Sequence, residues 1–526
     1  MTKIKNLIKD NPLYLLIIGI LLFQFGVEIW CGLDNDFYHI CFSGKQTIDN
    51  KWVLYENTSF ILDGFKTINQ QWLYSVIIYL SYTALGLTGV QLFTTIQFLV
   101  LCIVIYKLLM LYNVDKRTAV LIIAASMIIM SYVNCRPQMI SLILIYAQLY
   151  ITERYRQTGK TAILYLLPLL TLVQINVHST FWIFHFIFIL PYVVPFNTIV
   201  KMVFKKDTLI KDTVISVKPL IIPTVLMAVS LFINPYGIDA ILCLFLASDL
   251  AYLEVTEMMQ FGLFSIYAFY VVMGIVLAVV LYKQRKLTST TLYIFTGTSL
   301  LYAMAIRNII FYSIAVVFLF AELLKNINLN KFYDFVQGKK DGEATTKTQK
   351  QLIALMCGGI FILAAMTSIG VLTTRKELET GRDKPITPVS AVEYLRANEK
   401  DLSEIKLFAE VFSSSYFLHN GVGKVYMETK TEPLIEAING KKDIINEYVF
   451  IEKYATKADI EAFLAEYNFD YLYIRYDLNA LQLYLEMSED YECVVTGETQ
   501  ALANGGYEVA TYRLYKKVVN NDAQEN

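Results

Sequence analysis

The 526-residue chain has 56% hydrophobic and 14% aromatic side chains but only 17% charged ones, and its mean hydropathy is +0.47. This composition lies outside the range of soluble globular proteins and predicts an integral membrane protein. The formal net charge of -1 excludes a global basic or acidic field of the kind that attracts nucleic acid or an acidic substrate.

About eleven stretches are long and apolar enough to be transmembrane helices, which need roughly 20 residues each. They cover approximately residues 13–33, 87–111, 118–134, 137–152, 162–177, 179–200, 219–235, 263–282, 290–306, 309–325 and 351–372. The first follows three lysines as a signal peptide would, but it is long and lacks a cleavage site, which indicates an uncleaved span. The count could differ by two, because six of the stretches are short and interrupted by polar residues.

The distribution of lysine and arginine predicts the orientation. With the N-terminus in the cytoplasm, every cytoplasmic loop is basic, and the residues from Lys325 to Lys350 form a further basic cluster on that side. The opposite side keeps five cations before the last span: Lys45, Lys51, Lys66, Arg136 and Arg307. The positive-inside rule therefore favours a multi-pass protein of the cytoplasmic membrane, and an odd number of spans places the C-terminal domain outside.

The predicted organisation is an all-α membrane domain, residues 1–374, followed by an extracytoplasmic α/β domain, residues 375–526. The first outer loop covers residues 34–86, and within it Gln70 to Leu85 favours an interfacial helix because it is short and rich in Trp and Tyr. In the C-terminal domain, residues 388–398 and 457–467 predict helices. Residues 405–411, 424–427, 448–451, 471–475 and 508–515 predict strands.

Polar residues gather at the outer ends of the predicted spans. They are Asp34, Asp36 and His39 after the first span, Arg136 and Gln138, Asn176 and His178, the turn from Asn234 to Gly237, Glu254 and Glu257, and Arg307. A charge that faces lipid costs about 2 kcal/mol or more, so such groups usually line a cavity or pair with one another. We therefore expect these helix ends to form one outward-facing polar pocket.

Each of these residues also has a structural interpretation. Asp34 and Asp36 are typical of a solvated loop, and His178 could be satisfied by Asn176 or a backbone carbonyl. The Asn234 to Gly237 segment is typical of a helix-ending turn. Arg136 and Arg307 could extend to the interface, although a guanidinium also suits a phosphate.

Several motifs together resemble a poorly characterised group of bacterial polytopic membrane proteins related to the GT-C glycosyltransferases. The motifs are Asp34-x-Asp36-x-x-His39, Gly44, Gln71-Trp72-Leu73, Arg136-Pro137-Gln138, Asn176-x-His178, Asn234-Pro235-Tyr236-Gly237 and Arg307. In the C-terminal part, residues 388–395, 415–418 and 424–428 resemble the extracytoplasmic domain of that group. The chain departs from the group after residue 427, where Glu428-Thr429-Lys430 replaces a frequent Asp and Arg, and before Asn176, where Gln174-Ile175 replaces a frequent Trp.

The resemblance implies a lipid-phosphate sugar donor and a catalytic acidic residue in the first outer loop, either Asp36 or Asp34. His39, Arg136, Gln138, Asn176, His178, Glu257 and Arg307 are the candidate substrate-binding residues. The sequence itself does not support a divalent metal, because the seven cysteines are scattered and no zinc motif is present, and the cofactor stays open.

The leading hypothesis is a membrane glycosyltransferase of the cell envelope, which moves a sugar from a polyprenyl-phosphate donor to an acceptor on the outer face of the cytoplasmic membrane. Its expected partners are that sugar lipid and membrane lipids, with no nucleic acid. Two alternatives from other classes are a transporter or flippase, in which the same pocket only binds a polar substrate, and a non-catalytic scaffold for cell-envelope partners. Sugar transfer by the purified protein would separate the three hypotheses.

Overall fold

The structure is a computed structural model that describes residues 35–51, 54–56, 58–62, 64–129, 135–246, 260–262, 265–325, 387–428, 434–476, 479–503 and 506–518. Its described residues belong to two compact units. The helical unit lies within Gln91–Ile241 and Glu254–Val371, and the sheet unit within Leu33–Val90, Leu242–Leu253 and Leu372–Asn526. The predicted first and last spans, Asp34, Glu254, Glu257, the basic cluster beyond Lys325 and the domain boundary at residue 375 lie outside the described residues.

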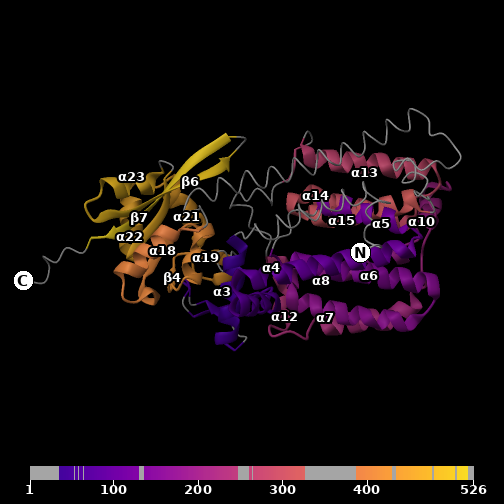
Figure 1. The fold of residues 1–526 in the computed structure, drawn as a ribbon, viewed down its shortest axis with the longest axis horizontal. Coiled ribbons are helices and arrows are strands. Elements are labelled where there is room, and N and C mark those ends of the chain that lie inside the picture. The colour runs from indigo at the N-terminus through magenta and orange to yellow at the C-terminus, as the bar shows by residue number, and fades with distance from the viewer. Residues whose placement is uncertain are drawn as a thin grey trace, which may run out of the picture. The chain divides into compact units, whose positions relative to one another are not determined.

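The helical unit is built from helices that run side by side, as α6, α7, α13, α14 and α15 do in Figure 1. Its α-helices are α5 Lys116–Ile129, α6 Gln138–Thr158, α7 Leu167–Val177, α8 Trp182–Ile187, α9 Leu190–Val193, α10 Phe196–Phe204, α11 Ile221–Ser230, α13 Ile266–Lys283, α14 Ser289–Met304 and α15 Ile309–Leu324. Four short 3-10 helices are η1 Thr161–Leu166, η2 Ser179–Phe181, η3 Lys218–Leu220 and η6 Ile306–Asn308. Two helices, α4 Trp72–Leu111 and α12 Ile238–Leu246, have residues in both units.

Within the described residues, two helices are long and apolar enough to cross a membrane, Trp72–Leu111 and Ile306–Leu324. A third candidate is the bent pair Ser179–Val193 and Phe196–Phe204, which meet at 67°. Three shorter apolar helices are Thr161–Val177, Lys218–Ser230 and Tyr267–Lys283. Every predicted span that the structure describes thus contains helix, while the number of eleven spans stays a prediction.

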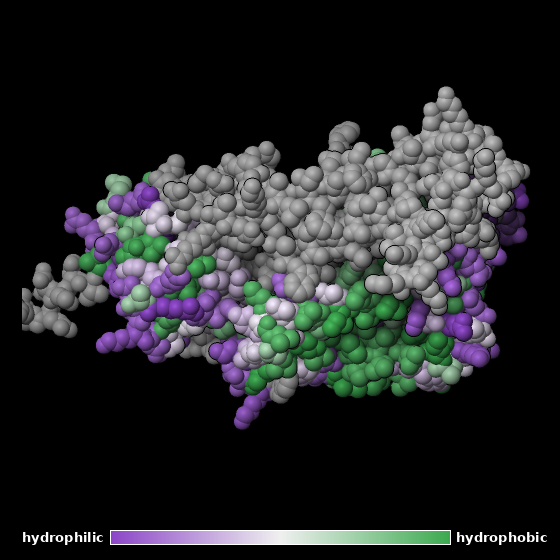
Figure 2. All heavy atoms as spheres, viewed as in Figure 1, coloured by the Kyte–Doolittle hydropathy of each residue, from purple (hydrophilic) through white to green (hydrophobic). Residues whose placement is uncertain are grey.

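The helical unit exposes apolar side chains at helical spacing. On α4, Leu92, Ile96, Leu99 and Ile103 are each 41–58% exposed, whereas Leu101, Ile105 and Leu108 on the opposite face are buried. In Figure 2, apolar side chains cover a broad area of this unit, with hydrophilic side chains gathered at its right-hand end. A solvated helix would place the polar face outward, so this arrangement is typical of helices that face lipid.

Helix α4 is broken at Gly86, whose backbone adopts φ 61° and ψ -149°. A positive φ is readily accessible to glycine and rarely to other residues. The break falls between the predicted interfacial helix, Gln70 to Leu85, and the predicted span from residue 87. The part of α4 before the break starts after Asn69, whose Oδ1 accepts a hydrogen bond from the backbone N–H of Gln71 at 3.1 Å.

The sheet unit contains a five-stranded mixed sheet in the order β4-β3-β5-β7-β6. Its strands are β3 Lys406–Ala409, β4 Lys424–Val425, β5 Tyr471–Tyr476, β6 Tyr491–Ala503 and β7 Gly506–Lys517. β3 is parallel to β4 and β5, while β7 is antiparallel to β5 and β6. The helices of this part are α18 Val389–Asn398, α19 Val411–His419, α20 Glu436–Asn439, α21 Ile444–Lys453, α22 Lys457–Tyr467 and α23 Ala480–Met487, with η7 Leu402–Glu404. The predicted α/β character is confirmed.

One predicted strand is wrong. Residues 448–451 belong to α21, whose first turn is capped by Asp443, because Oδ1 of that carboxylate accepts a hydrogen bond from the backbone N–H of Asn446 at 2.9 Å. Ile444, Tyr448 and Ile451 are buried at the spacing of one helix face. The four residues 448–451 are too short a segment to show this helical periodicity, and their apolar character was therefore interpreted as a strand. The predicted helix at residues 457–467 is confirmed as α22.

The first outer loop packs into the sheet unit. Its helix α3, Asn35–Asp49, lies against α19, and its short hairpin consists of β1 Leu54–Glu56 and β2 Phe65–Thr67. Between α3 and α4 the backbones approach so closely that a Cβ on Gly44 would lie 2.1 Å from the Ser75 carbonyl oxygen. Only glycine fits that contact, which gives a physical reason for Gly44 in the motif set.

The loop also joins the edge of the five-stranded sheet. The backbone N–H of Val425, in β4, donates to the Thr58 carbonyl at 2.7 Å, and the Ser59 hydroxyl donates to the Tyr426 carbonyl at 3.0 Å. Leu62 is buried in the apolar core that Phe408 and Tyr426 share. The loop that carries the candidate acidic residues is thereby held by the C-terminal domain.

Candidate functional site

The predicted site residues that the structure describes belong to two groups, one in each unit. Asp36 and His39 lie on α3 in the sheet unit, whereas the second group, in the helical unit, consists of Arg136, Gln138, Asn176, His178 and Arg307. Asp34 and Glu257 lie outside the described residues. Each group is described within its own unit.

Asp36 lies in the first turn of α3 and is half-buried. His39 follows one turn later and is also half-buried. Because residues three apart lie on one helix face, the two side chains emerge on the same side of α3.

An aromatic cluster surrounds the start of α3. The ring of His419, from α19, lies 5.4 Å from the ring of Tyr38, 5.4 Å from that of Tyr82 and 6.0 Å from that of Phe37. The rings of Tyr38 and Tyr416 are 4.9 Å apart in an edge-to-face arrangement. The cluster is therefore built from α3, α4 and α19, and it fixes the helix that carries Asp36.

Burial controls the titration of this cluster. It raises the pKa of Tyr38 to about 12, with smaller contributions from Tyr416 and Tyr82. It lowers the pKa of His419, and the positive charges of Lys45 and Arg396 act in the same direction. At neutral pH the cluster therefore holds neutral rings, which present apolar faces and hydroxyl groups of the kind that bind sugars and other polar organic ligands.

In the helical unit, His178 is held between α6 and α7. Its Nδ1 is 3.1 Å from the Ser141 hydroxyl, and the Gln174 amide donates both to that hydroxyl at 3.0 Å and to the His178 carbonyl at 2.8 Å. The ring also lies 4.0 Å from that of Phe181. With Nδ1 engaged by Ser141, Nε2 is the ring nitrogen that is left for a ligand.

Arg307 lies near this histidine. It is exposed in η6, the 3-10 turn between α14 and α15, and its guanidinium is close enough to the His178 ring to act on its charge. Arg136 and Gln138 are half-buried at the start of α6, one turn before Ser141. Residues from three separate sequence regions thus lie at one end of the helical unit, and their sharing of one polar pocket stays a prediction.

Two asparagines at this end support the backbone. The Asn176 amide donates to the Leu172 carbonyl at 2.8 Å, within α7, and to the Ile233 carbonyl at 2.9 Å, which joins α7 to the segment that follows α11. Asn234 accepts from the Tyr236 N–H at 2.8 Å and donates to the Gly237 carbonyl at 3.1 Å. The structural interpretation of the Asn234 to Gly237 turn is confirmed, and Asn176 is a positioning group in the structure.

Sequence reasoning did not single out Ser141, Tyr82, Tyr416 or His419 as parts of a site. Ser141 lies one turn after Pro137, so helical spacing from the Arg136 motif was a signal that could have identified it. No spacing in the sequence joins Tyr82 to α19, because that contact arises only in the tertiary fold. Among the described residues, no group of three His, Cys, Asp or Glu side chains could hold a metal ion.

Among the comparisons with known proteins, the comparison with solved structures identifies similar folds. No family model matches the chain, and a search of curated proteins returned no match. Among solved structures, the oligosaccharyltransferase of Archaeoglobus fulgidus in its apo form is similar, with a TM-score of 0.54 at 10% identity over 87% of this chain and 69% of that one. The archaeal oligosaccharyltransferase AglB of the same organism, in complex with an inhibitory peptide and a dolichol-phosphate, has a TM-score of 0.54 at 11% identity over 95% and 74%. The chain therefore shares the fold of that oligosaccharyltransferase.

Proposed function

We propose that this protein is a membrane glycosyltransferase that moves a sugar from a polyprenyl-phosphate donor to an acceptor outside the cytoplasmic membrane. The observation that carries the proposal is the fold shared with oligosaccharyltransferases over 87–95% of the chain. One of those structures holds a dolichol-phosphate, which is a polyprenyl-type lipid phosphate. The motifs that resemble the bacterial GT-C-related group point in the same direction, and we assign the chain to that group within this proposal.

The proposed reaction is an inverting displacement. The carboxylate of Asp36 or Asp34 takes the proton of the acceptor hydroxyl while its oxygen forms a bond to the anomeric carbon of the sugar. The bond between that carbon and the lipid phosphate oxygen breaks, and the lipid phosphate leaves with the electron pair. General-base catalysis of this kind typically contributes a factor of about 100 or more.

Cationic and hydrogen-bonding side chains stabilise the leaving phosphate in this proposal. Arg307 is the main candidate, because a guanidinium can hold two phosphate oxygens in a bidentate fork. The Nε2 of His178 and the side chains of Arg136 and Gln138 are further candidates for the same role, and Glu257 and His39 for binding the sugar or the acceptor. Asn176 contributes by fixing the helix end that presents His178.

The aromatic cluster at the start of α3 supports a binding role for the sheet unit. Sugar rings and peptide side chains pack on neutral aromatic faces, and Tyr38, Tyr82 and Tyr416 are all half-buried, so each keeps part of its surface open. This surface is the proposed place for the acceptor.

The test is a transfer assay with the full-length protein in lipid nanodiscs. The probes are polyprenyl-phosphate-linked glucose, mannose and N-acetylglucosamine, each radiolabelled in the sugar, with membrane extracts as the acceptor source. The proposal predicts loss of label from the lipid and its appearance in a covalent product, and it predicts that Asp36→Asn stops this transfer. Asp49→Asn, at the exposed end of the same helix, is the matched control and retains transfer.

The other outcomes overturn the proposal. Movement of intact sugar lipid across a vesicle membrane without cleavage would instead support the transporter hypothesis. The absence of any cleavage, transport or donor binding by a folded protein would leave the scaffold hypothesis.

A further inference from the structure

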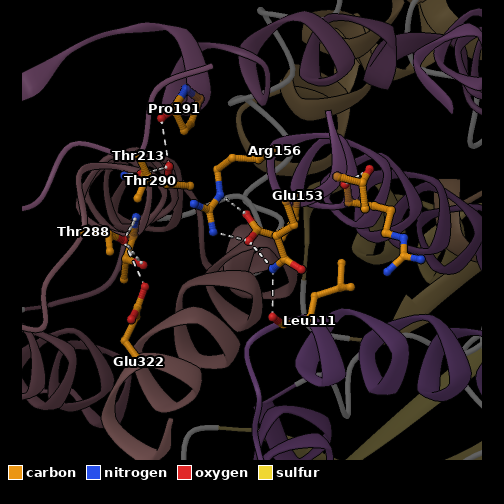
Figure 3. Close-up of polar contacts among 12 residues, drawn as sticks. Leu111, Glu153, Arg156, Pro191, Thr213, Thr288, Thr290 and Glu322 are labelled. Atoms are coloured by element: carbon orange, nitrogen blue, oxygen red, sulfur yellow. Dashed lines mark hydrogen bonds and ion pairs between the residues drawn. The ribbon is translucent and has the colours of Figure 1, made fainter. Parts of the chain in front are cut away.

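A cavity of about 230 Å3 lies in the helical unit, at the opposite ends of the helices from His178 and Arg307. Its lining comes from five regions: Tyr112 just after α4, the last two turns of α6, the segment between α10 and η3, the connection from α13 into the first turn of α14, and the end of α15. These are loops and helix ends that the positive-inside rule assigns to the cytoplasm. Figure 3 labels Glu153, Arg156, Thr213, Thr288, Thr290 and Glu322 among the lining residues and shows their polar contacts.

One side of the cavity is formed by an ion pair on α6. Arg156 donates through Nε to the Glu153 carboxylate at 2.9 Å and through a second nitrogen at 2.5 Å, and the Glu153 side chain is only 1% exposed. Gln157 links the same carboxylate to the Leu111 carbonyl, at 2.9 and 2.8 Å (Figure 3). The charge of Arg156 is therefore balanced within the protein.

Hydroxyl groups form the next side. The hydroxyls of Thr213 and Thr290 are 2.5 Å apart, and Thr290 donates to the Pro191 carbonyl at 3.1 Å (Figure 3). The backbone of Lys211 pairs with Leu287 and Ser289 at 3.1 and 2.9 Å. The two loops that carry the cationic side chains are therefore joined at the start of α14.

The remaining charges are strongly unbalanced. Four further cations line the cavity, namely Lys211, Arg285, Lys286 and Lys325, against one further carboxylate, Glu322. Glu322 accepts from the Thr288 hydroxyl at 3.1 Å. In the part of the chain that the structure describes, no carboxylate lies within ion-pair distance of these four cations. The charge of Lys325 also acts on Glu322. Cations that outnumber the carboxylates lining a cavity attract an anion and repel a metal ion.

The chemistry of the lining selects phosphate among anions. The cations carry this selection, because arginine and lysine are the side chains that hold phosphate oxygens. The hydroxyls of Thr288 and Thr290 and the first N–H groups of α14 donate within the protein and shape the lining. At about 30 Å3 per water molecule in the liquid, the cavity has the volume of roughly seven waters, which is more than a single small ion needs. We propose that this cavity is a binding site for a phosphate group, distinct from the donor phosphate of the proposed transfer reaction.

Two sources supply such a phosphate, an anionic lipid headgroup and a free phosphate ion. The neighbouring helix α10 favours the lipid. Its apolar side chains Met202, Val203 and Phe204 are 76, 64 and 67% exposed, as in a helix that lies at a membrane surface. Asn197, near the start of α10, accepts from the Thr208 hydroxyl at 2.6 Å and donates to the Ile210 carbonyl at 2.9 Å. The segment that carries Lys211 is thus anchored to a helix at headgroup level.

The experiment measures phosphate binding by the full-length protein in two arms. In the first arm, inorganic phosphate is titrated into detergent-solubilised protein, and the midpoint of thermal unfolding is followed. In the second arm, native mass spectrometry measures lipid retained from nanodiscs of phosphatidylcholine, with and without phosphatidic acid. The site variant is Arg285→Gln with Lys286→Gln. The control is Lys205→Gln with Lys206→Gln, which removes the same charge from exposed positions that do not line the cavity.

We expect the site variant to weaken phosphate or phosphatidic acid binding about tenfold or more, the effect of losing a charge-assisted hydrogen bond, and the control to change it less than about twofold. Lys325→Gln, a third lining position, should weaken binding in the same direction. Binding in both arms identifies a general phosphate site, and binding in the second arm alone identifies a lipid site. Absence of binding in both arms, or equal losses in the site variant and the control, would overturn the proposal. Sugar transfer is not the readout, so this result is independent of the proposed function.

Discussion

The two ends of the helical unit use polar residues in different ways. At the end with His178 and Arg307, the described hydrogen bonds join side chains to one another and to backbone carbonyls, as Gln174 and Asn176 do. At the other end, Lys211, Arg285 and Lys286 line a cavity whose described lining holds one ion pair, Glu153–Arg156. Polar residues at helix ends therefore serve two tasks. Those that are hydrogen-bonded within the protein hold helices in place, and those that line the cavity present charge to a ligand.

The comparison requires that the two ends face different sides of the membrane. We expect an all-or-none result from labelling with a membrane-impermeant maleimide. Cys493, exposed in the sheet unit, should react in intact cells, whereas Lys206→Cys at the basic end should react only after permeabilisation. Lys206→Cys is made in a Cys493→Ser background, and the Cys493→Ser protein alone is the blank for the remaining cysteines. Labelling of Lys206→Cys in intact cells would reverse the orientation and, with it, the assignment of the phosphate cavity to the cytoplasmic side.

The largest expected loss of stability is at the paired charges of the basic end. Glu153→Gln removes the partner of Arg156 in a buried ion pair, which typically costs about 3–5 kcal/mol, so we expect a loss of about 3 kcal/mol or more in the free energy of unfolding. Glu461→Gln is the control, because its pair with Lys457 is exposed and worth less than about 1 kcal/mol. Equal losses in thermal unfolding would contradict the assigned structural role of Glu153.

Arg307→Lys tests whether Arg307, at the opposite end of the helical unit, binds phosphate or has a structural role. It keeps the charge and removes the bidentate fork, so we expect donor use, measured as kcat/KM, to fall about tenfold while thermal stability stays unchanged. Arg154→Lys, an exposed arginine of the basic end, should change neither quantity. If Arg307→Lys and Arg307→Gln shift only the unfolding temperature, Arg307 has a structural role and the phosphate role is withdrawn.

The smallest expected effect is the pH dependence of the aromatic cluster. Burial lowers the pKa of His419, so below its unfolded value of about 6.5 the unfolded chain binds the proton more readily than the folded chain. The stability that the neutral ring provides is present above about pH 6.5 and is lost as the pH falls below it. Thermal unfolding of wild type and His419→Gln between about pH 8 and pH 5 should converge at low pH. A constant difference would exclude this titration.

Hydropathy in the sequence predicted helix within each apolar run that the structure describes, and it separated the two parts of α4 that meet at Gly86. That success has a physical basis, because every apolar run long enough to meet lipid must satisfy its own backbone hydrogen bonds as a helix. The same reasoning failed for residues 448–451, where Tyr448 and Ile451 favour a strand locally but belong to the buried face of α21. The sheet unit is water-exposed, so tertiary packing decides there between helix and strand.

The candidate sites were predictable to different degrees. The grouping of Arg136, His178 and Arg307 at one end follows from helix direction, which the sequence shows. The contact of α3 with α19 and the cavity among Arg156, Lys211 and Lys286 depend on which loops meet, and residues so far apart in sequence carry no local signal of that. For that reason the basic loops were interpreted only as an orientation signal.

The most direct test of the central claim is sugar transfer by the purified protein in nanodiscs, measured side by side for wild type, Asp36→Asn and Asp49→Asn. The proposed function predicts transfer from a polyprenyl-phosphate donor by wild type and Asp49→Asn, and a loss of about 100-fold or more in Asp36→Asn with normal membrane insertion. Transfer by Asp36→Asn within a few-fold of wild type would contradict the role of Asp36. Loss of transfer in Asp34→Asn alone would then move the base to Asp34, and no transfer by any folded form would contradict the glycosyltransferase claim itself.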